Sequence, residues 1–339
     1  MLLSMLCLAL GISSPPPAPA PVKVVTSLTT YGAIAREIVG DRGTVNSIAQ
    51  GDEDPHFVQP KPSFVALLRD ADLFVTTGMD LELWVPALLD RANNRNVAEG
   101  GRGYVAANAG VELLEIPASV SRAQGDIHAA GNPHIHTDPL NAILIARNIL
   151  RGLERVAPAD ADYFREREAD FERRILAATM GAEVVRILTP QTALDLLRND
   201  QLLPFLTRTT LDGRPLASRL GGWLKTAEVF RDKEIVCYHK EWAYFSRRYR
   251  INCVQYIEPK PGIPPTPRHV HDVISLMRER KIPVLLASNY FSRSQIKQVA
   301  DRTGATAIIV PENTHGAPGV ETYFQLMDTW VTSLAAAFK

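Results

Sequence analysis

The sequence is poor in cysteine, has no long hydrophobic run and carries no excess of charge. Only three of 339 residues are cysteine, and no Cys-x-x-Cys pair occurs, which argues against a thiolate zinc site of the finger type. The apolar stretch Leu2–Ile12 is too short to span a bilayer, which takes roughly 20 residues. The formal net charge is zero, so the basic footprint of a nucleic-acid-binding protein is missing.

The N-terminal residues have the pattern of a targeting segment. Leu2–Ile12 is followed by the Pro/Ala run Pro15–Pro21, which is typical of a secretory signal core and a loose tether, although no Lys or Arg precedes the core. We therefore predict a signal-like leader and Pro-rich tether at residues 1–21, and a periplasmic or extracellular protein, possibly membrane-tethered. A disordered cytoplasmic leader is the alternative. Lipid attachment at Cys7 fits poorly with Leu6 before it.

The other two cysteines, Cys237 and Cys253, lie in predicted strands. A disulfide between them is possible in an oxidising compartment, but two buried thiols is the favoured interpretation.

Strands alternate with helices along most of the chain, which indicates parallel β-α-β units and an α/β fold. Short β-branched or apolar segments predict the strands, and apolar residues at helical spacing predict the helices. The predicted strands are Val22–Leu28, Thr44–Ile48, Ala71–Thr77, Glu234–Tyr238, Cys253–Ile257, Val284–Ala287 and Thr306–Val310. The predicted helices are Tyr31–Val39, Pro62–Arg69, Leu81–Ala92, Trp242–Tyr249, His269–Arg280, Ser292–Thr303 and Val320–Phe338.

Two further helices are predicted in the middle of the chain, at Pro139–Val156 and at Asp160 to about Leu188. The second would run roughly 40 Å at 1.5 Å per residue, long enough to connect two halves of the molecule. We therefore predict two lobes, each with a mostly parallel sheet flanked by helices, joined by a long rigid connector helix. The predicted regions are an N-terminal lobe at 22–138, connector helices at 139–188, and a C-terminal lobe at 189–339 with an insertion at about 182–230.

Histidines follow several predicted strands or precede the connector. His56 lies in GDEDPHFVQP, His134 and His136 in GNPHIHTDP, and His239 directly after EIVCY. Ligands of open α/β folds bind outside the carboxyl ends of the strands, so facing lobes could bring these side chains together. Imidazole suits Zn²⁺ and other late divalent ions, and four protein ligands would hold an ion without an open catalytic position.

Each candidate also has an ordinary structural interpretation. His56 could cap a turn, the His134–His136 loop could be solvated, and His239 could be a satisfied core histidine. His134 and His136 would face the same side if their segment were extended. His128 and His315 are expected to be exposed or to support other ligands, and His269 and His271 to lie on the surface. Among the carboxylates, Glu312 after TAIIVP could complete the shell, whereas Asp138 could cap the next helix.

The sequence resembles the zinc/manganese solute-binding proteins of bacterial ABC importers, the TroA-like family, over nearly all of residues 22–339. The resemblance rests on DPHFVQPKPS, GNPHIHTDP, YHKEWAYFSRRYRI, IEPKPGIPPTP and GVETYFQLMD. It implies two α/β lobes joined by a rigid helix, with His56, His134 and His239 binding the ion. The family's usual Asp in the last loop is missing, which leaves Glu312 as the best substitute, followed by His315 or a water. His136 replaces an aromatic residue and is an alternative ligand.

The resemblance implies a transport receptor and not an enzyme. Three histidines favour Zn²⁺ over Mn²⁺ as the captured ion, which a membrane permease of the ABC type would receive; we expect a monomer. Two alternatives remain open from the residues. One is a His-ligated hydrolase with Glu241 or Glu312 as general base, although no HExxH motif occurs. The other is a receptor for a chelated metal, which would need a larger site with aromatic or cationic residues.

Overall fold

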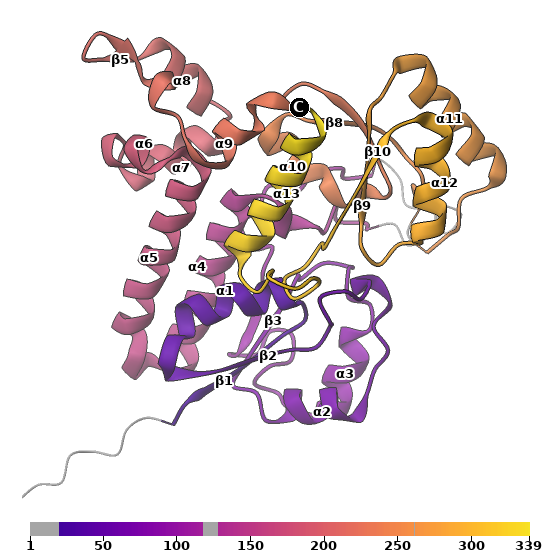
Figure 1. Ribbon diagram of the computed structural model, residues 1–339. Coiled ribbons are helices and arrows are strands. Elements are labelled where there is room, and N and C mark those ends of the chain that lie inside the picture. Colours follow the sequence, from indigo (N-terminus) through magenta and orange to yellow (C-terminus); the bar gives the residue numbers. More distant parts are fainter. Residues whose placement is uncertain (1–19, 118–127, 261) are drawn as a thin grey trace, which may run out of the picture.

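The computed structural model describes residues 20–117, 128–260 and 262–339 (Figure 1). The predicted leader at residues 1–21 lies almost wholly outside these described residues. Two parallel four-stranded sheets, with strand orders β2-β1-β3-β4 and β10-β9-β7-β8, carry the fold. The predicted α/β class with two helix-flanked sheets is therefore confirmed.

The first sheet is formed by β1 (Val22–Thr26), β2 (Gly43–Ser47), β3 (Leu73–Thr76) and β4 (Tyr104–Ala106). β1 lies between β2 and β3, and its Val24 and Val25 are both buried, as expected for a parallel strand covered on both faces. In Figure 1, α1 (Thr29–Val39) lies on one side of this sheet, and α2 (Pro62–Arg69) and α3 (Val85–Ala92) lie on the other. The short edge strand β4 was not predicted from the sequence.

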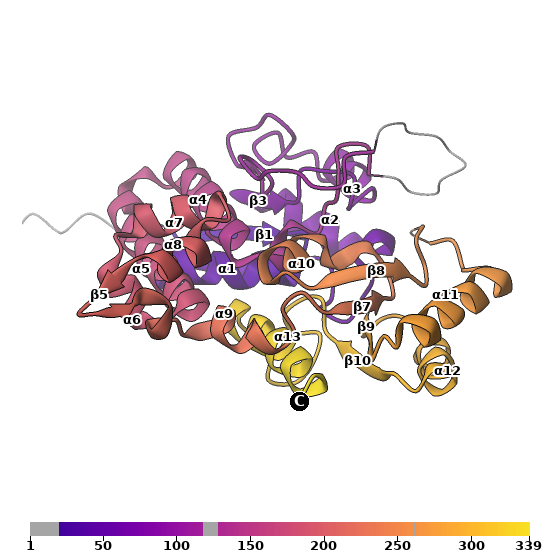
Figure 2. The same ribbon diagram turned by 90° about the horizontal axis from the view of Figure 1, so that it is seen from above.

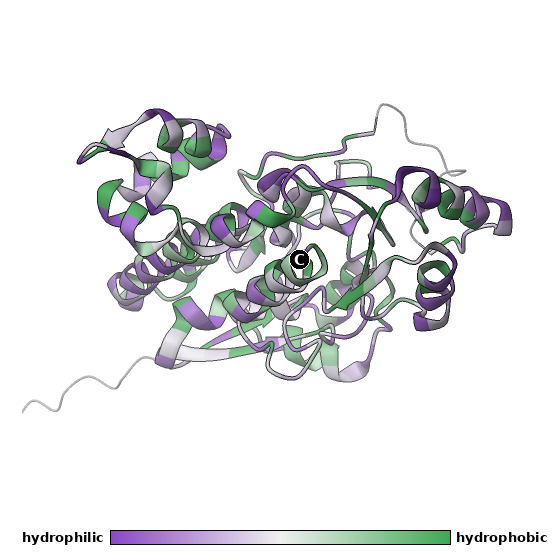
Figure 3. Cartoon of the chain, turned by 45° about the horizontal axis from the view of Figure 1, so that its top comes forward, coloured by the Kyte–Doolittle hydropathy of each residue, from purple (hydrophilic) through white to green (hydrophobic). Residues whose placement is uncertain are grey.

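The second sheet is formed by β7 (Glu234–Cys237), β8 (Asn252–Tyr256), β9 (Val284–Ser288) and β10 (Thr306–Val310). Successive residues of β7 point to opposite faces: Ile235 and Cys237 join the large central core, and Val236 joins a second core. The second core packs under α11 (Pro267–Arg280) and α12 (Arg293–Thr303). Figure 3 shows that the outward sides of these helices are largely hydrophilic. The other face packs against α10 (Ala243–Tyr249) and α13 (Tyr323–Ala337).

The connector consists of α4 (Pro139–Val156) and α5 (Ala161–Met180), which pack against each other. The prediction that the second helix continues to about residue 188 is wrong. It ends at Met180 because Gly181 has φ +91°, and α6 (Ala182–Ile187) then starts in a new direction. The 20 residues of α5 correspond to a length of about 30 Å. A Cβ at Gly181 would lie 2.8 Å from Gly221 Cα, so this close crossing also requires glycine.

After α6 come α7 (Pro190–Arg198), α8 (Leu202–Arg208), a hairpin of β5 (Thr210–Leu211) and β6 (Arg214–Pro215), and α9 (Gly222–Thr226). Figures 1 and 2 both place this region at the end of the molecule opposite α11 and α12. The hairpin was not predicted from the sequence. Its Asp212-Gly213 turn, with φ +51° and +74°, is a standard hairpin signal that the sequence did contain.

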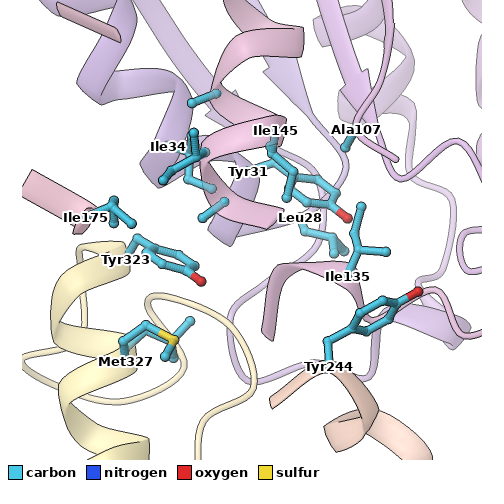
Figure 4. Packing of buried hydrophobic residues seen from close by; sticks show 14 of the residues in the cluster. Leu28, Tyr31, Ile34, Ala107, Ile135, Ile145, Ile175, Tyr244, Tyr323 and Met327 are labelled. Atoms are coloured by element: carbon cyan, nitrogen blue, oxygen red, sulfur yellow. The ribbon is translucent and has the colours of Figure 1, made fainter. Parts of the chain in front are cut away.

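The central core joins the two sheets. Figure 4 shows Tyr31 and Ile34 of α1, Ile145 of α4, Ile175 of α5, and Tyr323 and Met327 of α13 packed together. A core shared by distant segments holds both sheets in a defined relation to the connector. The lobe boundaries at 22–138, 139–188 and 189–339 stay a prediction.

The expectation of two free thiols in the second sheet is wrong. Cys237 and Cys253 form a disulfide between the neighbouring strands β7 and β8, with Cα atoms 5.7 Å apart. Ile235 pairs with Cys253, and a register shift follows between Ile235 and Val236, so no sequence pattern shows how these side chains meet. The disulfide lies two residues before His239, at the end of the sheet that carries the candidate site.

Candidate metal centre

The three histidines predicted as metal ligands meet where the two sheets face each other. The ring centroids of His56 and His134 are 5.4 Å apart, those of His56 and His239 6.0 Å, and those of His134 and His239 6.2 Å. His134 and His239 are 1% and 2% exposed. His56 follows β2 and His239 follows β7, so parallel strands from both sheets direct these rings to one place.

His56 is held by the turn in which it lies. Pro55–Phe57 form one 3-10 turn, and Asp54 at its start accepts hydrogen bonds from the backbone N–H of His56 at 3.0 Å and from its Nδ1 at 2.7 Å. Trp84 Nε1 donates to the carbonyl of Pro55 at 2.8 Å and fixes this turn against α3. With Nδ1 donating to Asp54, Nε2 is the ring nitrogen with a lone pair for a ligand.

His134 and His239 are oriented in the same way. The Asn132 side-chain oxygen accepts from the backbone N–H and from the Nδ1 of His134, both at 3.0 Å. Asn132 also donates to the carbonyl of Lys240 at 2.6 Å, which ties this loop to the second sheet. His239 Nδ1 donates to the carbonyl of Glu258 at 2.6 Å. Outer hydrogen bonds of this kind set the tautomer and ring direction of metal-binding histidines.

A fourth histidine, His128, joins the group, although the sequence predicted it only as exposed or supporting. Its Nε2 lies 3.3 Å from Nε2 of His56, and its ring centroid lies 6.2 Å from that of His134. Its Nδ1 lies 3.1 Å from the carbonyl oxygen of Asp80. No sequence motif identified His128 as a ligand. The residue reaches the site through the course of the backbone after residue 127.

Glu312 approaches the site from the buried side. It is 0% exposed, and its Oε1 lies 3.7 Å from His134 Nε2 and 3.8 Å from His136 Nε2. Its other oxygen accepts from Tyr290, whose hydroxyl also contacts Glu241. Burial raises the pKa of Glu241 to about 7, and burial together with the charge of Glu241 raises the pKa of Glu312 well above its usual range. Both carboxyl groups therefore hold their protons to a higher pH than an exposed glutamate does.

His136 lies behind Glu312. Its ring is fully buried near Tyr31 and Trp330, with centroid distances of 6.2 and 6.5 Å. The segment after His134 is a 3-10 turn, Ile135–Thr137, so the extended conformation in which both rings would face one side is not present. Both rings nevertheless approach Glu312.

The remaining candidates lie apart from this group. Asp138 caps α4 by accepting from the backbone of Leu140, as predicted. His315 is exposed, His271 has a 67% exposed side chain, and His269 contacts the carbonyl of Tyr256 at 2.8 Å.

The arrangement fits a small cation after a modest adjustment. In the described part of the chain, no three His, Cys, Asp or Glu side chains already stand close enough to hold an ion together. Tetrahedral Zn–N bonds of about 2.0–2.1 Å would place neighbouring nitrogens about 3.3–3.4 Å apart and ring centroids about 5.2 Å apart. The observed centroid separations of 5.3–6.2 Å need shifts of about 1 Å or less. Nε2 of His134 is buried without a hydrogen-bond partner, which a bound cation would correct.

Comparison with known proteins agrees with the fold. A profile of the family described as ZnuA, zinc-uptake complex component A, periplasmic, matches residues 24–184 and 222–337. The iron-binding protein YfeA of Yersinia pestis is 27% identical over 333 residues, covering 97% of this chain and 90% of the relative. The manganese ABC transporter substrate-binding lipoprotein PsaA of Streptococcus pneumoniae is 22% identical over 283 residues, covering 82% of this chain and 76% of that relative. A crystal structure of ZnuA matches with TM-score 0.67 at 19% identity, covering 94% of this chain and 100% of that chain, and shows the shared fold.

These matches bear on the remaining predictions. The family is one of transport components, so the prediction that the chain is not an enzyme is confirmed and the hydrolase alternative is set aside. The predicted place outside the cytoplasm is confirmed through the same relatives. Among the described residues, no helix combines the length and the apolar character that crossing a membrane requires. The chain belongs to the ZnuA family of substrate-binding proteins of metal ABC transporters.

Proposed function

We propose that this protein captures Zn²⁺ through His56, His134 and His239 and delivers it to an ABC-type membrane permease. The observation that carries the proposal is the convergence of three imidazoles whose Nδ1 atoms are each engaged by a fixed acceptor. Ring nitrogens oriented in this way are ready to bind a cation with little further ordering. Glu312 is within reach as a further ligand from the buried side, and His136 behind it is the less supported alternative.

Zinc is favoured by the chemistry of the ligands. Imidazole suits Zn²⁺, whereas Mn²⁺ favours carboxylate and other oxygen ligands. Related proteins are named for iron and for manganese, so family membership leaves the ion open, and the choice of zinc rests on the histidines. Nearly complete burial of His134 and His239 also favours a bare ion over a bulky chelate.

Competition binding tests this function. Metal-free protein is titrated with Zn²⁺, Mn²⁺ and Fe²⁺ against chromophoric chelators, with Fe²⁺ handled without oxygen. We expect one tight Zn²⁺ site per chain and weaker binding of the other two ions. Tighter binding of Mn²⁺ or Fe²⁺ than of Zn²⁺ would contradict the choice of ion, and absence of all three would contradict the function.

The buried rings of His134, His136 and His239 are expected to stay neutral well below a pH of about 6.5, the ordinary pKa of histidine. Burial lowers the pKa of His136 and of His239 to about 4, and lowers that of His134 well below its usual range, with neighbouring histidines adding to the effect. In the unfolded chain these rings take protons near pH 6.5, so their contribution to stability is lost as pH falls from about 6.5 toward 4. Glu241, with its pKa raised to about 7, acts in the opposite direction.

A global unfolding curve would mix these opposite effects, so the prediction concerns individual rings. NMR titration of the histidine Cε1–H signals in metal-free protein should show His136 and His239 still neutral at pH 5.5. Because neutral imidazole binds metal, these rings add little proton competition above about pH 5. Midpoints near 6.5 for both rings would contradict the prediction.

A further inference from the structure

We propose that His128 is a ligand of the captured ion and occupies the fourth corner of the site on its outer side. This inference rests on the proposed function and extends it, because neither the sequence motifs nor the three-histidine set assigns a role to this residue. The resulting site would consist of four imidazoles, from His56, His128, His134 and His239.

The first argument is distance. Nε2 of His128 and Nε2 of His56 are 3.3 Å apart, which matches the edge of about 3.3–3.4 Å between two nitrogens on one tetrahedral zinc ion. The rings of these two residues are 5.3 Å apart between centroids, the shortest separation in the group. His128 therefore already stands at the spacing that a shared ion requires.

The second argument is orientation. Nδ1 of His128 lies 3.1 Å from the carbonyl oxygen of Asp80, just as the Nδ1 atoms of the other three rings contact Asp54, Asn132 and the carbonyl of Glu258. In every case this contact leaves Nε2 as the ring nitrogen for an ion. The same Nδ1 contact on all four rings indicates a common role, since such contacts fix which ring nitrogen binds metal.

The third argument concerns the competing fourth ligand. Glu312 is engaged with Tyr290 and shares a buried polar network with Glu241. Binding an ion through Glu312 would require this carboxyl group to leave part of that network. The His128 ring is half-buried, and its Nε2 already lies 3.3 Å from that of His56.

The experiment uses Co²⁺ as a spectroscopic substitute for zinc, together with zinc affinity by chelator competition. Four-coordinate Co²⁺ absorbs visible light more strongly than five- or six-coordinate Co²⁺, so the band intensity reports the coordination number. Full-length protein is compared with His128→Ala, with His134→Ala and with the surface control His271→Ala. Each variant is checked for a native circular dichroism spectrum.

We expect His128→Ala to bind Zn²⁺ about 10- to 100-fold more weakly, a smaller loss than for the buried His134, because water can take the vacant corner on the solvent side. The Co²⁺ bands should change shape or weaken, and added free imidazole should restore them if only the fourth ligand is missing. His271→Ala should behave as the unchanged protein does.

The outcomes separate this inference from the function on which it rests. If the unchanged protein binds neither Zn²⁺ nor Co²⁺, the proposed function itself fails. If it binds both ions, His134→Ala loses them and His128→Ala keeps full affinity and an unchanged spectrum, then the role of His128 is overturned while the function stands. Loss of affinity in Glu312→Gln alone would then identify the carboxylate as the fourth ligand.

Discussion

Replacing His134 by alanine is expected to weaken zinc binding by about 100- to 1,000-fold, if the roughly 10–16 kcal/mol of a structural zinc site is shared among four ligands. His134 should show the full effect because it is fully buried and its ring lies near His56, His128 and His239. Because His134 is only 1% exposed, a solvent ligand would not easily replace the lost nitrogen. Chelator competition measures the change directly.

The control for this substitution is His271→Ala, since the His271 side chain is 67% exposed and lies outside the group. A second variant, His134→Gln, preserves side-chain polarity and separates loss of the ligand from loss of packing. Both His134 variants should remain folded by circular dichroism. Zinc affinity within threefold of the unchanged protein in His134→Ala would rule this residue out as a ligand.

Replacing Arg248 by methionine is expected to lower the free energy of unfolding by about 3–5 kcal/mol, the usual cost of leaving one partner of a buried ion pair unpaired. Arg248 Nε and Nη2 each donate to Asp138 at 2.9 Å, and both side chains are only 6% exposed. Nη1 donates to the carbonyl of Leu197 at 2.8 Å. The guanidinium group therefore links α10 with the start of α4 and with α7, and methionine retains its bulk but none of these bonds.

Urea unfolding of the metal-free protein measures this effect, with Arg280→Met as the matched control. The Arg280–Glu234 pair is 50% and 41% exposed, so its loss should change stability by about 1 kcal/mol or less. The double variant Arg248→Met, Asp138→Asn should recover part of the loss, because the unpaired charge is removed while the cap of α4 is kept. Stability of Arg248→Met within 1 kcal/mol of the unchanged protein would show that the pair contributes little.

Local patterns in the sequence were sufficient for most of the elements. Alternation of short apolar strands with amphipathic helices indicated the parallel sheets, because this periodicity is set by which side chains are buried. The error in the connector came from reading helical spacing through Gly181, whose positive φ ends α5. The edge strand β4 was missed because its three residues are too short for a periodic signal.

The candidate ligands also divide into those that the sequence identified and one that only folding brings to the site. His56, His134 and His239 stood out because each lies beside a strand end or in a family-like motif, and parallel strand ends meet at one edge. His128 has no such mark. Its position depends on the loop that precedes α4 and on its contact with the carbonyl of Asp80, which is a product of folding.

By itself, the sequence determined the α/β class, the approximate elements and three candidate histidines, two after strands and one before the connector, because these depend on local periodicity and turn chemistry. Only the tertiary structure decided that His128 approaches the same point, that Glu312 shares a buried network with Glu241, and that Cys237 pairs with Cys253. These are contacts between residues distant in the chain. Their distances follow from how the two sheets pack on a common core, and no local pattern encodes that packing.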